Sequence, residues 1–328
     1  MSRFPDAKSL TLNDFTPDDV TVTISLYNKE NSIERAVLSI LNQKKSPKEV
    51  IVVDDGSSDK GAQIVQQLCE DYPEITYIHQ ENSGVSVARN RGVQEAKTKL
   101  VCLLDADDVW EPNYIENLME LTATAPEADF YTLAYRMSSE HGWLKPEVDL
   151  PAEFIGTVHD PIRRYSRGYG LIHTSAICFK KDFFQITGGF PEGVNFGEDL
   201  YLWLQSCVSG TLAFSNKISV TLYKEPVNSV NRRKLHPYHV KFFTEHLSDY
   251  TKDEQAALKE FLIKNIFIQW AAARLEGNRW QQKTLQQYCL KLSKTKGLIL
   301  LAAGLFPAEF FRHLKNRRTE KRLIKKNV

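Results

Sequence analysis

Short apolar runs alternate with helix-like patterns over the first hundred residues of the chain. The apolar runs predict four strands, at 20–26, 50–53, 76–79 and 100–104. Between them, apolar residues recur three and four positions apart, which predicts helices at 33–41, 58–70 and 84–97. Such an alternation predicts a parallel sheet with helices on both faces.

Polar residues stand where the first two predicted helices begin. Asn31 is followed three residues later by Glu34, a spacing typical of a capping box at a helix start. Ser57 and Ser58 are the corresponding candidates for the second helix. We therefore expect these residues to cap the two helices.

From residue 112 onward the pattern is less regular. It predicts helices at 113–122, 182–186 and 200–208, strands at 129–136, 171–179 and 217–223, and a mostly helical region after Pro237. The 328 residues are 42% hydrophobic and 25% charged, which is ordinary for a soluble globular protein. The net charge of +1 gives no reason to expect a nucleic-acid partner.

The cysteines indicate the compartment. There are five, they are isolated in the sequence, and most lie in apolar segments, which favours buried free thiols in a reducing environment. Residues 1–19 lack the apolar core of a signal peptide. No apolar stretch approaches the roughly 20 residues that span a bilayer. We therefore expect a cytoplasmic protein.

The run Asp105-Ala106-Asp107-Asp108 follows the predicted strand at 100–104. Ligand sites in open α/β sheets lie at such strand ends. Two carboxylates one residue apart can hold Mg²⁺ or Mn²⁺, which prefer hard oxygen ligands. Taken alone this signal is weak, because aspartates are also common in turns.

Two further strand ends carry residues suited to a flat, polar ligand. Tyr27 can stack on a nucleobase, and the hydroxyl of Ser25 can bond its edge. After the second strand, Asp55 can accept a hydrogen bond from a nucleobase N–H, and Gly56 permits a tight turn. The plain alternative for both segments is an ordinary strand-to-helix turn.

Two predicted helix starts carry charged residues. Arg89 lies about one and a half turns into the helix at 84–97, where a guanidinium suits a diphosphate or nearby carboxylates. Glu198 and Asp199 precede the helix at 200–208, and a carboxylate there can act as a general base. The alternatives are a bracing arginine and simple charge capping.

In their order and spacing, these motifs closely resemble those of the family 2 glycosyltransferases, which have the GT-A fold and invert the anomeric centre. The matching stretches, within residues 20–210, are 22–28, 49–57, 82–90, 103–108 and 188–204. The resemblance implies an α/β fold with a Rossmann-like, mainly parallel sheet flanked by helices and a mostly helical C-terminal region. It divides the chain into an N-terminal extension (1–19), a nucleotide-sugar-binding half (20–111), an acceptor-binding half with the catalytic base (112–235) and a helical C-terminal region with a basic tail (236–328).

The resemblance also implies roles for the donor-site residues. Ser25, Tyr27 and Asp55 would bind the nucleobase. Asn82 and Arg89 would contact the nucleoside or the diphosphate.

The remaining implied roles concern the metal and the reaction. Asp107 and Asp105 would ligate Mn²⁺ or Mg²⁺, with Asp107 the main ligand and Asp105 also facing the ribose or sugar, and Asp108 is left as a turn residue. Asp199, paired with Glu198, would be the catalytic base, and Gly188-Gly189-Phe190 would form a loop beside the donor sugar.

The expected function is therefore a metal-assisted, inverting transfer of sugar from a nucleotide sugar, with UDP favoured because Tyr27 and Asp55 suit uracil. The acceptor would be a glycan or lipid-linked saccharide in bacterial-type surface polysaccharide or lipopolysaccharide assembly. The Gln-x-x-Arg-Trp motif of processive members is absent, so single or limited additions are expected.

Other details depart from the family or remain open. Gln205 stands where many relatives carry arginine. His236 and His239 are candidates for a further metal ligand, although a helix or turn surface is the simpler placement for each.

Two other function classes account for parts of the sequence less well. Residues 105–109 superficially match the Asp loop of haloacid-dehalogenase phosphatases, but that loop follows the first strand, whereas three strands precede it here. A nucleotide-sugar-binding protein without catalysis is the non-enzyme alternative, and the intact Asp107 and Asp199 argue against it.

The C-terminal sequence combines an apolar segment with a basic one. Residues 297–311 contain a single charge, whereas 312–328 contain eight Lys or Arg and one acidic residue, Glu320. This combination suits an anionic membrane surface and predicts peripheral contact at the inner face of the cytoplasmic membrane. The alternative is a helix packed on the catalytic domain with a frayed basic end.

Overall fold

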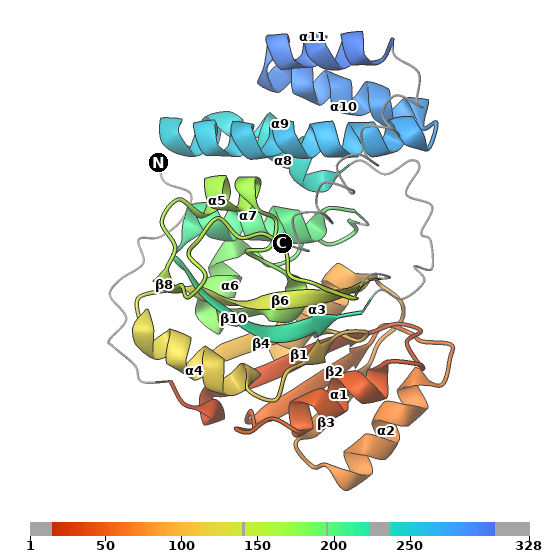
Figure 1. The fold of residues 1–328 in the computed structure, drawn as a ribbon. Helices are drawn as coiled ribbons and strands as arrows, with labels where there is room; N and C mark the ends of the chain where they lie inside the picture. The colour runs from red at the N-terminus through yellow and green to blue at the C-terminus, as the bar shows by residue number, and fades with distance from the viewer. Residues whose placement is uncertain (1–14, 140–141, 195, 224–236, 306–328) are drawn as a thin grey trace. The chain divides into compact units, whose positions relative to one another are not determined.

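The computed structural model describes residues 15–139, 142–194, 196–223 and 237–305 (Figure 1). The chain divides into two compact units, residues 1–228 and 229–328.

The first unit begins with four parallel strands. These are β1 (Val20–Leu26), β2 (Glu49–Asp54), β3 (Ile75–His79) and β4 (Leu100–Asp105), in the spatial order β3-β2-β1-β4. Three helices connect them: α1 (Ile33–Leu41), α2 (Gly61–Asp71) and α3 (Val85–Glu95). The predicted parallel half of the sheet is confirmed. Its apolar strand residues form a continuous buried core with the inner faces of α1 and α2.

The same sheet continues with strands that do not follow chain order. Beyond β4 lie β9 (Ile177–Lys180), β6 (Phe130–Ser139), β10 (Leu212–Leu222) and β5 (Val109–Trp110). β9 runs antiparallel to both β4 and β6, whereas β6 and β10 are parallel. Two short strands, β7 (Gly142–Leu144) and β8 (Ile155–Thr157), pair with β6 and β10. The sheet is therefore mixed.

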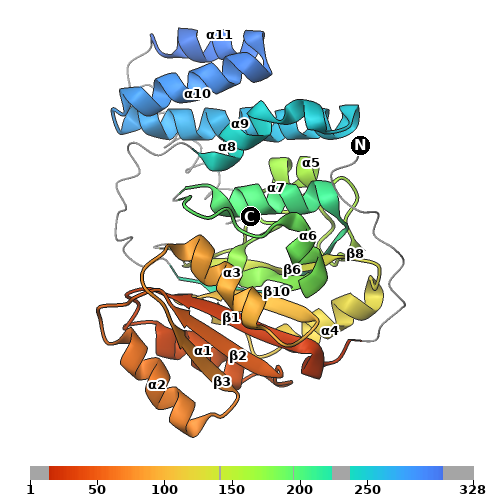
Figure 2. The same cartoon turned by 180° about the vertical axis from the view of Figure 1, so that it is seen from behind.

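Helices cover both faces of this sheet. The helices of the second half are α4 (Tyr114–Thr124), α5 (Pro161–Arg167), α6 (Lys181–Thr187) and α7 (Glu198–Ser209). α1 and α4 lie on one face, and α3 and α6 lie on the other, as the two opposite views show (Figures 1 and 2).

Three local predictions are wrong. The strand expected at 171–179 begins only at Ile177, because residues 174–176 form a 3-10 turn. Neither Asn31 nor Ser57 or Ser58 caps a helix: α1 follows Ser32 and α2 follows Lys60, without side-chain capping bonds. The loops before these helices are instead tied to each other, because Asn28 Oδ1 accepts a hydrogen bond from Ser58 N and Asp59 Oδ2 accepts one from Glu30 N.

The second unit is helical in its described part, as expected for the C-terminal region. It contains α8 (Tyr238–Glu245), α9 (Lys252–Leu275), α10 (Arg279–Leu292) and α11 (Lys294–Ala303). Thr251 and Glu254 form a capping box at the start of α9. Among the described residues, no helix is both long and apolar enough to span a bilayer.

The structure describes only one of the two histidines that the sequence offers as candidates for a further metal ligand. His239 is fully buried in the second unit, where its Nε2 lies 2.9 Å from Asn265 Oδ1. Its expected place on a helix or turn surface is therefore wrong. His236 lies outside the described residues.

Candidate active site

Parallel pairing brings the predicted site residues to one edge of the sheet. Ser25 is in register with Val53 on one side and with Asp105 on the other. Tyr27 is the first residue after β1, and 51% of its surface is exposed. Asp55 follows β2, and its backbone N–H donates to Leu26 O (2.8 Å). Three strand ends thus present a half-exposed ring, a hydroxyl and two carboxylates along the same edge.

Asp55 also fixes the start of α3. Its Oδ1 accepts hydrogen bonds from Ser83 N and Gln80 Nε2, and its Oδ2 accepts one from Gly84 N, all at 2.8–2.9 Å. Gly56, at φ +75°, is so close to this loop that a Cβ there would lie 2.9 Å from Asn82 N. The packing places Asn82, which is exposed, beside the end of β2.

Arg89 connects three elements at the centre of the site. From α3, its Nη2 lies 2.7 Å from Asp105 Oδ1 at the end of β4, and its Nη1 lies 3.8 Å from Glu198 Oε1 on α7. Its guanidinium also sits 5.1 Å from the centre of the Phe190 ring. Burial tends to raise the pKa of Asp105, but the charge and hydrogen bond of Arg89, together with the charges of His173 and Lys29, lower it overall.

The two predicted catalytic carboxylates, Glu198 and Asp199, lie on the first turn of α7. Gly197, at φ +81°, precedes it, and Asp199 Oδ1 accepts a hydrogen bond from Leu200 N (2.7 Å). Burial and the neighbouring Asp199 charge raise the pKa of Glu198. The Asp199 charge also acts on Arg89 and His173. Both acidic residues therefore belong to the same electrostatic cluster as Asp105.

The loop at 188–190 is fastened to α3 by two hydrogen bonds. Asn90 Nδ2 donates to Phe190 O, and Phe190 N donates to Asn90 Oδ1, each at 2.8 Å. Gly189 adopts φ +69°, and a Cβ there would lie 2.8 Å from Asn90 Oδ1. The loop therefore needs glycine at position 189. Its anchor on α3, Asn90, is the residue after Arg89.

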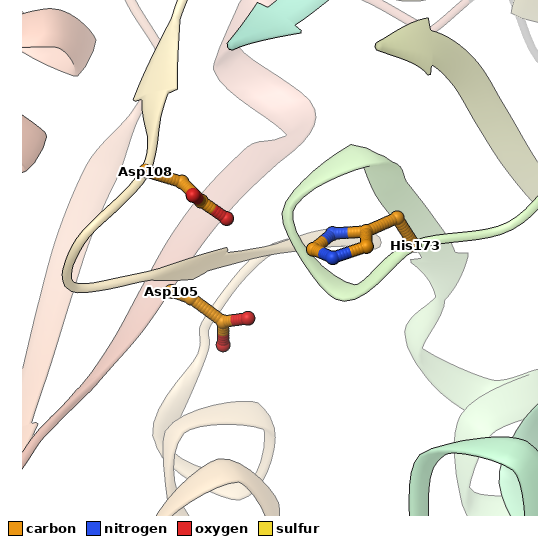
Figure 3. A group of neighbouring side chains, drawn as sticks. All are labelled: Asp105, Asp108 and His173. Atoms are coloured by element: carbon orange, nitrogen blue, oxygen red, sulfur yellow. The ribbon is translucent and has the colours of Figure 1, made fainter. Parts of the chain in front are cut away.

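A compact set of candidate metal ligands includes Asp105, the partner of Arg89. Asp105, Asp108 and His173 each offer a ligand atom, and these atoms lie within 4.8 Å of one another. Figure 3 shows two of the side chains coming from the end of β4 and the turn after it, and the imidazole coming from the opposite segment. Among the described residues this is the group found with such spacing.

Ser175 organises this group. Its hydroxyl donates to Asp108 Oδ2 (2.5 Å) and accepts from Asp105 N (3.2 Å), while its own N–H donates to His173 Nδ1 (3.2 Å). Burial, together with the negative charges of Asp105 and Asp107, raises the pKa of Asp108 to about 8. Burial also lowers the pKa of His173, which favours the neutral imidazole that metals bind.

Asp107 lies outside that group. Its Oδ2 is 2.5 Å from Lys29 Nζ, and its backbone carbonyl accepts a hydrogen bond from Arg35 Nη2 (3.0 Å). The metal role expected for Asp107 stays a prediction. Sequence reasoning did not single out His173 and treated Asp108 as a turn residue, because no local motif marks either one. They meet only when β9, which follows Ser175, pairs with β4.

The Asp105–Asp108–His173 group fits a divalent cation. Carboxylate oxygens and imidazole nitrogen are ligands for Mn²⁺ and other divalent ions, and ligand distances of about 2.0–2.6 Å need only small side-chain movements from the present spacing. Burial and the negative charges of Asp105 and Asp107 raise the pKa of Asp108, and a cation bound here would favour its carboxylate form.

A pocket of about 550 Å³ opens beside residues 109–112, which follow Asp108. Arg35 and Tyr223 line it, with the guanidinium 4.1 Å from the ring centre. Trp143, half exposed, meets the Tyr223 ring edge-on with centroids 6.1 Å apart, and the Arg136 guanidinium lies 4.6 Å from its centre. Two aromatic rings and two guanidinium groups thus form one surface next to Asp107 and Asp108.

The matching family model and two relatives in sequence are all described as glycosyltransferases. A family model described as "Glycosyl transferase family 2" matches residues 21–184, which is half of the chain. The uncharacterized glycosyltransferase YibD of Escherichia coli (strain K12) is 38% identical over 102 residues, or 31% of this chain and 30% of YibD. An uncharacterized glycosyltransferase of Rickettsia prowazekii (strain Madrid E) is 27% identical over 206 residues, or 61% of this chain and 62% of the relative. The chain thus spans about a third of YibD and under two thirds of the Rickettsia protein.

The fold is similar to that of solved structures. The crystal structure of S. aureus TarS 1-349 in complex with UDP-GlcNAc matches with a TM-score of 0.68 at 17% identity, covering 85% of this chain and 82% of that one. This likeness confirms the expected GT-A-like fold, with a mixed sheet flanked by helices and a helical C-terminal region. The motifs at strand ends β1, β2 and β4 all lie within the matched family segment, and the chain belongs to glycosyl transferase family 2.

Proposed function

We propose that this protein is an inverting glycosyltransferase that moves a sugar from a nucleotide-sugar donor to a hydroxyl of a glycan or lipid-linked saccharide. The observation that carries the proposal is the cluster in which Arg89 pairs with Asp105 and approaches Glu198. It unites the strand edge suited to a donor with the carboxylates suited to activate an acceptor.

A UDP-sugar is the first choice of donor. Tyr27 is exposed enough to stack on a flat base, and Ser25 and Asp55 lie beside it at the sheet edge. Asp55 already accepts three hydrogen bonds, yet two carboxylate oxygens provide about four acceptor sites, which leaves one for a nucleobase N–H. We assign Asn82 and Arg89 to the nucleoside and diphosphate. The TarS structure, whose title names UDP-GlcNAc, supports this choice by analogy of fold.

We further propose that Asp105, Asp108 and His173 hold Mn²⁺ or Mg²⁺. When bound, the ion would offset the charge that develops on the departing diphosphate. Asp107 is the competing ligand, and its use would require the Lys29–Asp107 ion pair to open. Calorimetric titration of the protein with Mn²⁺ alone separates the two sets. Asp108→Asn and His173→Ala should abolish binding under the first assignment, and Asp107→Asn should do so under the second.

The proposed mechanism is a single displacement. Asp199 takes the proton of the acceptor hydroxyl, whose oxygen attacks the anomeric carbon from the face opposite the nucleotide. The bond from that carbon to the diphosphate oxygen breaks, and its electron pair leaves with the nucleoside diphosphate. Because attack and departure occur on opposite faces, the anomeric configuration inverts. The buried Arg89 is placed to bind the departing diphosphate or to steady Asp105.

The pocket beside the 105–112 loop is our candidate for the acceptor. Tyr223 lines this pocket and the exposed Trp143 meets its ring edge-on, and aromatic rings suit sugar rings, which present apolar C–H faces. Trp143→Ala should raise the KM for acceptor and leave donor binding unchanged, whereas equal effects on both would remove this assignment. We place the activity in cytoplasmic assembly of bacterial-type surface polysaccharide or lipopolysaccharide. The five free thiols of the chain support a reducing compartment.

The test is nucleotide release and sugar transfer from UDP-, GDP- and dTDP-sugars with Mn²⁺, for the native protein and for Asp199→Asn. The variant keeps the shape of the first turn of α7 but removes the base, so transfer should fall by about 10²–10⁴-fold while UDP binding stays nearly intact. Asp182→Asn, on the neighbouring helix α6, is the matched control and should remain active. Normal transfer by Asp199→Asn would show that the base is misassigned. UDP binding without transfer in the native protein would favour a binding protein that lacks catalysis.

A further inference from the structure

Helix α11 of the second unit is apolar on a face that the described structure leaves uncovered. Leu298, Leu301 and Leu305 are 60%, 44% and 87% exposed, and Ile299 is 47% exposed beside them. With 3.6 residues per turn, the spacing of the three leucines aligns them along one side of the helix and its final turn. Exposed leucines are common singly, but a row of them on one helix indicates an interaction surface.

An adjacent side of α11 packs against the rest of the second unit. Gly297 and Leu300 are its buried residues, and a Cβ on Gly297 would lie 2.5 Å from Leu290 Cδ2 of α10. Arg274 of α9 donates to Gly304 O (3.0 Å), which fixes the end of the helix. Because α11 is held in this orientation, its leucine face cannot turn inward without losing these contacts.

The sequence on both sides of this face is cationic. Lys294 and Lys296 are exposed at the start of α11, and the described part of the helix carries no acidic residue. Residues 312–328, whose structure is not described, contain eight Lys or Arg and one Glu. An apolar face between basic segments matches the interface of an anionic bilayer, where leucines enter the acyl boundary and lysines or arginines meet phosphate headgroups.

We propose that the leucine face of α11, Leu298, Leu301 and Leu305, is a docking surface for anionic lipid membranes. The basic residues of 312–328 add electrostatic attraction to the same bilayer. A surface for a second copy of the chain would not need this excess of positive charge, because like charges of two copies would repel one another. The proposal is independent of the transferase activity, since docking requires no donor or acceptor.

The test is flotation of the full-length protein with vesicles, without nucleotide sugar. Vesicles of phosphatidylcholine alone are compared with vesicles in which about a third of the lipid is phosphatidylglycerol. The native protein should bind the anionic vesicles and release from them as salt is raised. The triple substitution Leu298→Ser, Leu301→Ser, Leu305→Ser should lower the partition coefficient by about tenfold or more.

A matched control removes exposed apolar side chains elsewhere in the same unit. Ile268→Ser with Trp280→Ser changes residues that are 50% and 42% exposed on α9 and α10, and it should bind like the native protein. All these sites are exposed, and unchanged circular dichroism would show that each variant folds.

Three results would overturn the proposal. They are failure of the native protein to bind anionic vesicles, equal losses in the triple variant and the control, and a dimer in sedimentation velocity that the triple substitution dissociates without affecting vesicle binding. None of these results would change the assay of transfer from a soluble donor, so the two proposals fail independently.

Discussion

Residues 20–111 and residues 112–223 contribute to one sheet in different ways. In the first segment β1 to β4 all run parallel: β1 pairs with β2, β2 pairs with β3, and β4 returns to pair with β1. In the second, β9 inserts between β4 and β6 and runs antiparallel to both. The first arrangement brings strand ends to one edge through local repetition. The second brings Ser175, His173 and Glu198 to that edge through pairings between residues far apart in sequence.

The difference explains how the charges are distributed. Within the first segment, Asp105 pairs with Arg89 and Asp107 pairs with Lys29. The second segment adds the Ser175 hydroxyl, which donates to Asp108, and Glu198, which approaches Arg89. Each half therefore leaves polar groups unsatisfied without the other. Three substitutions, Arg89→Met, Asp108→Asn and Asn90→Ala, separate the two contributions, and their expected effects decrease in that order.

Arg89→Met should have the largest effect. The substitution keeps much of the side-chain volume but leaves Asp105 and Glu198 without their buried cationic neighbour. Breaking a buried ion pair in this way costs about 3–5 kcal/mol. Urea unfolding at neutral pH measures the loss. Arg91→Met, two residues along the same helix and outside this ion pair, is the control. A loss below about 1 kcal/mol in Arg89→Met, as for a surface pair, would show that the two segments do not depend on this residue.

The second effect depends on pH and concerns Asp108. Burial and the Asp105 charge raise its pKa from 3.8 to about 8 in the folded protein. Between these values the folded state holds a proton that the unfolded chain has released, so the free energy of unfolding falls as pH rises towards 8 and levels off above it. With a chelator present, the native protein should lose about 3 kcal/mol between pH 6 and pH 9 relative to Asp108→Asn.

Urea unfolding of both proteins at pH 6, 7, 8 and 9 gives that difference. Mn²⁺ should reduce the slope of the native protein, because a bound cation favours the carboxylate form. If the two proteins have parallel pH profiles in chelator, Asp108 titrates near its ordinary value. The second segment, through Ser175 and Tyr223, would then solvate the carboxylate better than its burial indicates.

The same contrast sets the limit of what the sequence alone could predict. Strands and helices up to residue 105 follow from periodicity, and strand polarity then places Ser25, Asp55 and Asp105 together. His173 could not be found in this way, because it precedes a short strand in a segment without a motif. Its position depends on which strand β9 joins, which is a property of long-range packing. The caps failed for a related reason, since Asn28 and Asp59 bond across two loops that local patterns treat separately.

Asn90→Ala should have the smallest of the three effects. It tests the contact between Asn90 of the first segment and Phe190 of the second, away from the buried charges. Asn90 makes two hydrogen bonds of 2.8 Å to the backbone of Phe190, and alanine removes both. Phe190 is 1% exposed, so its N–H and C=O would find few substitutes, and the expected loss is about 1–2 kcal/mol. Hydrogen exchange at Phe190 N–H should quicken, while exchange in β1 and β2 stays unchanged. Glu95→Ala, exposed on the same helix, should alter neither quantity. If exchange quickens equally in β1 and at Phe190, the two segments unfold as one unit. In that case the two segments would differ in the order and direction of their strands but not in their stability towards unfolding.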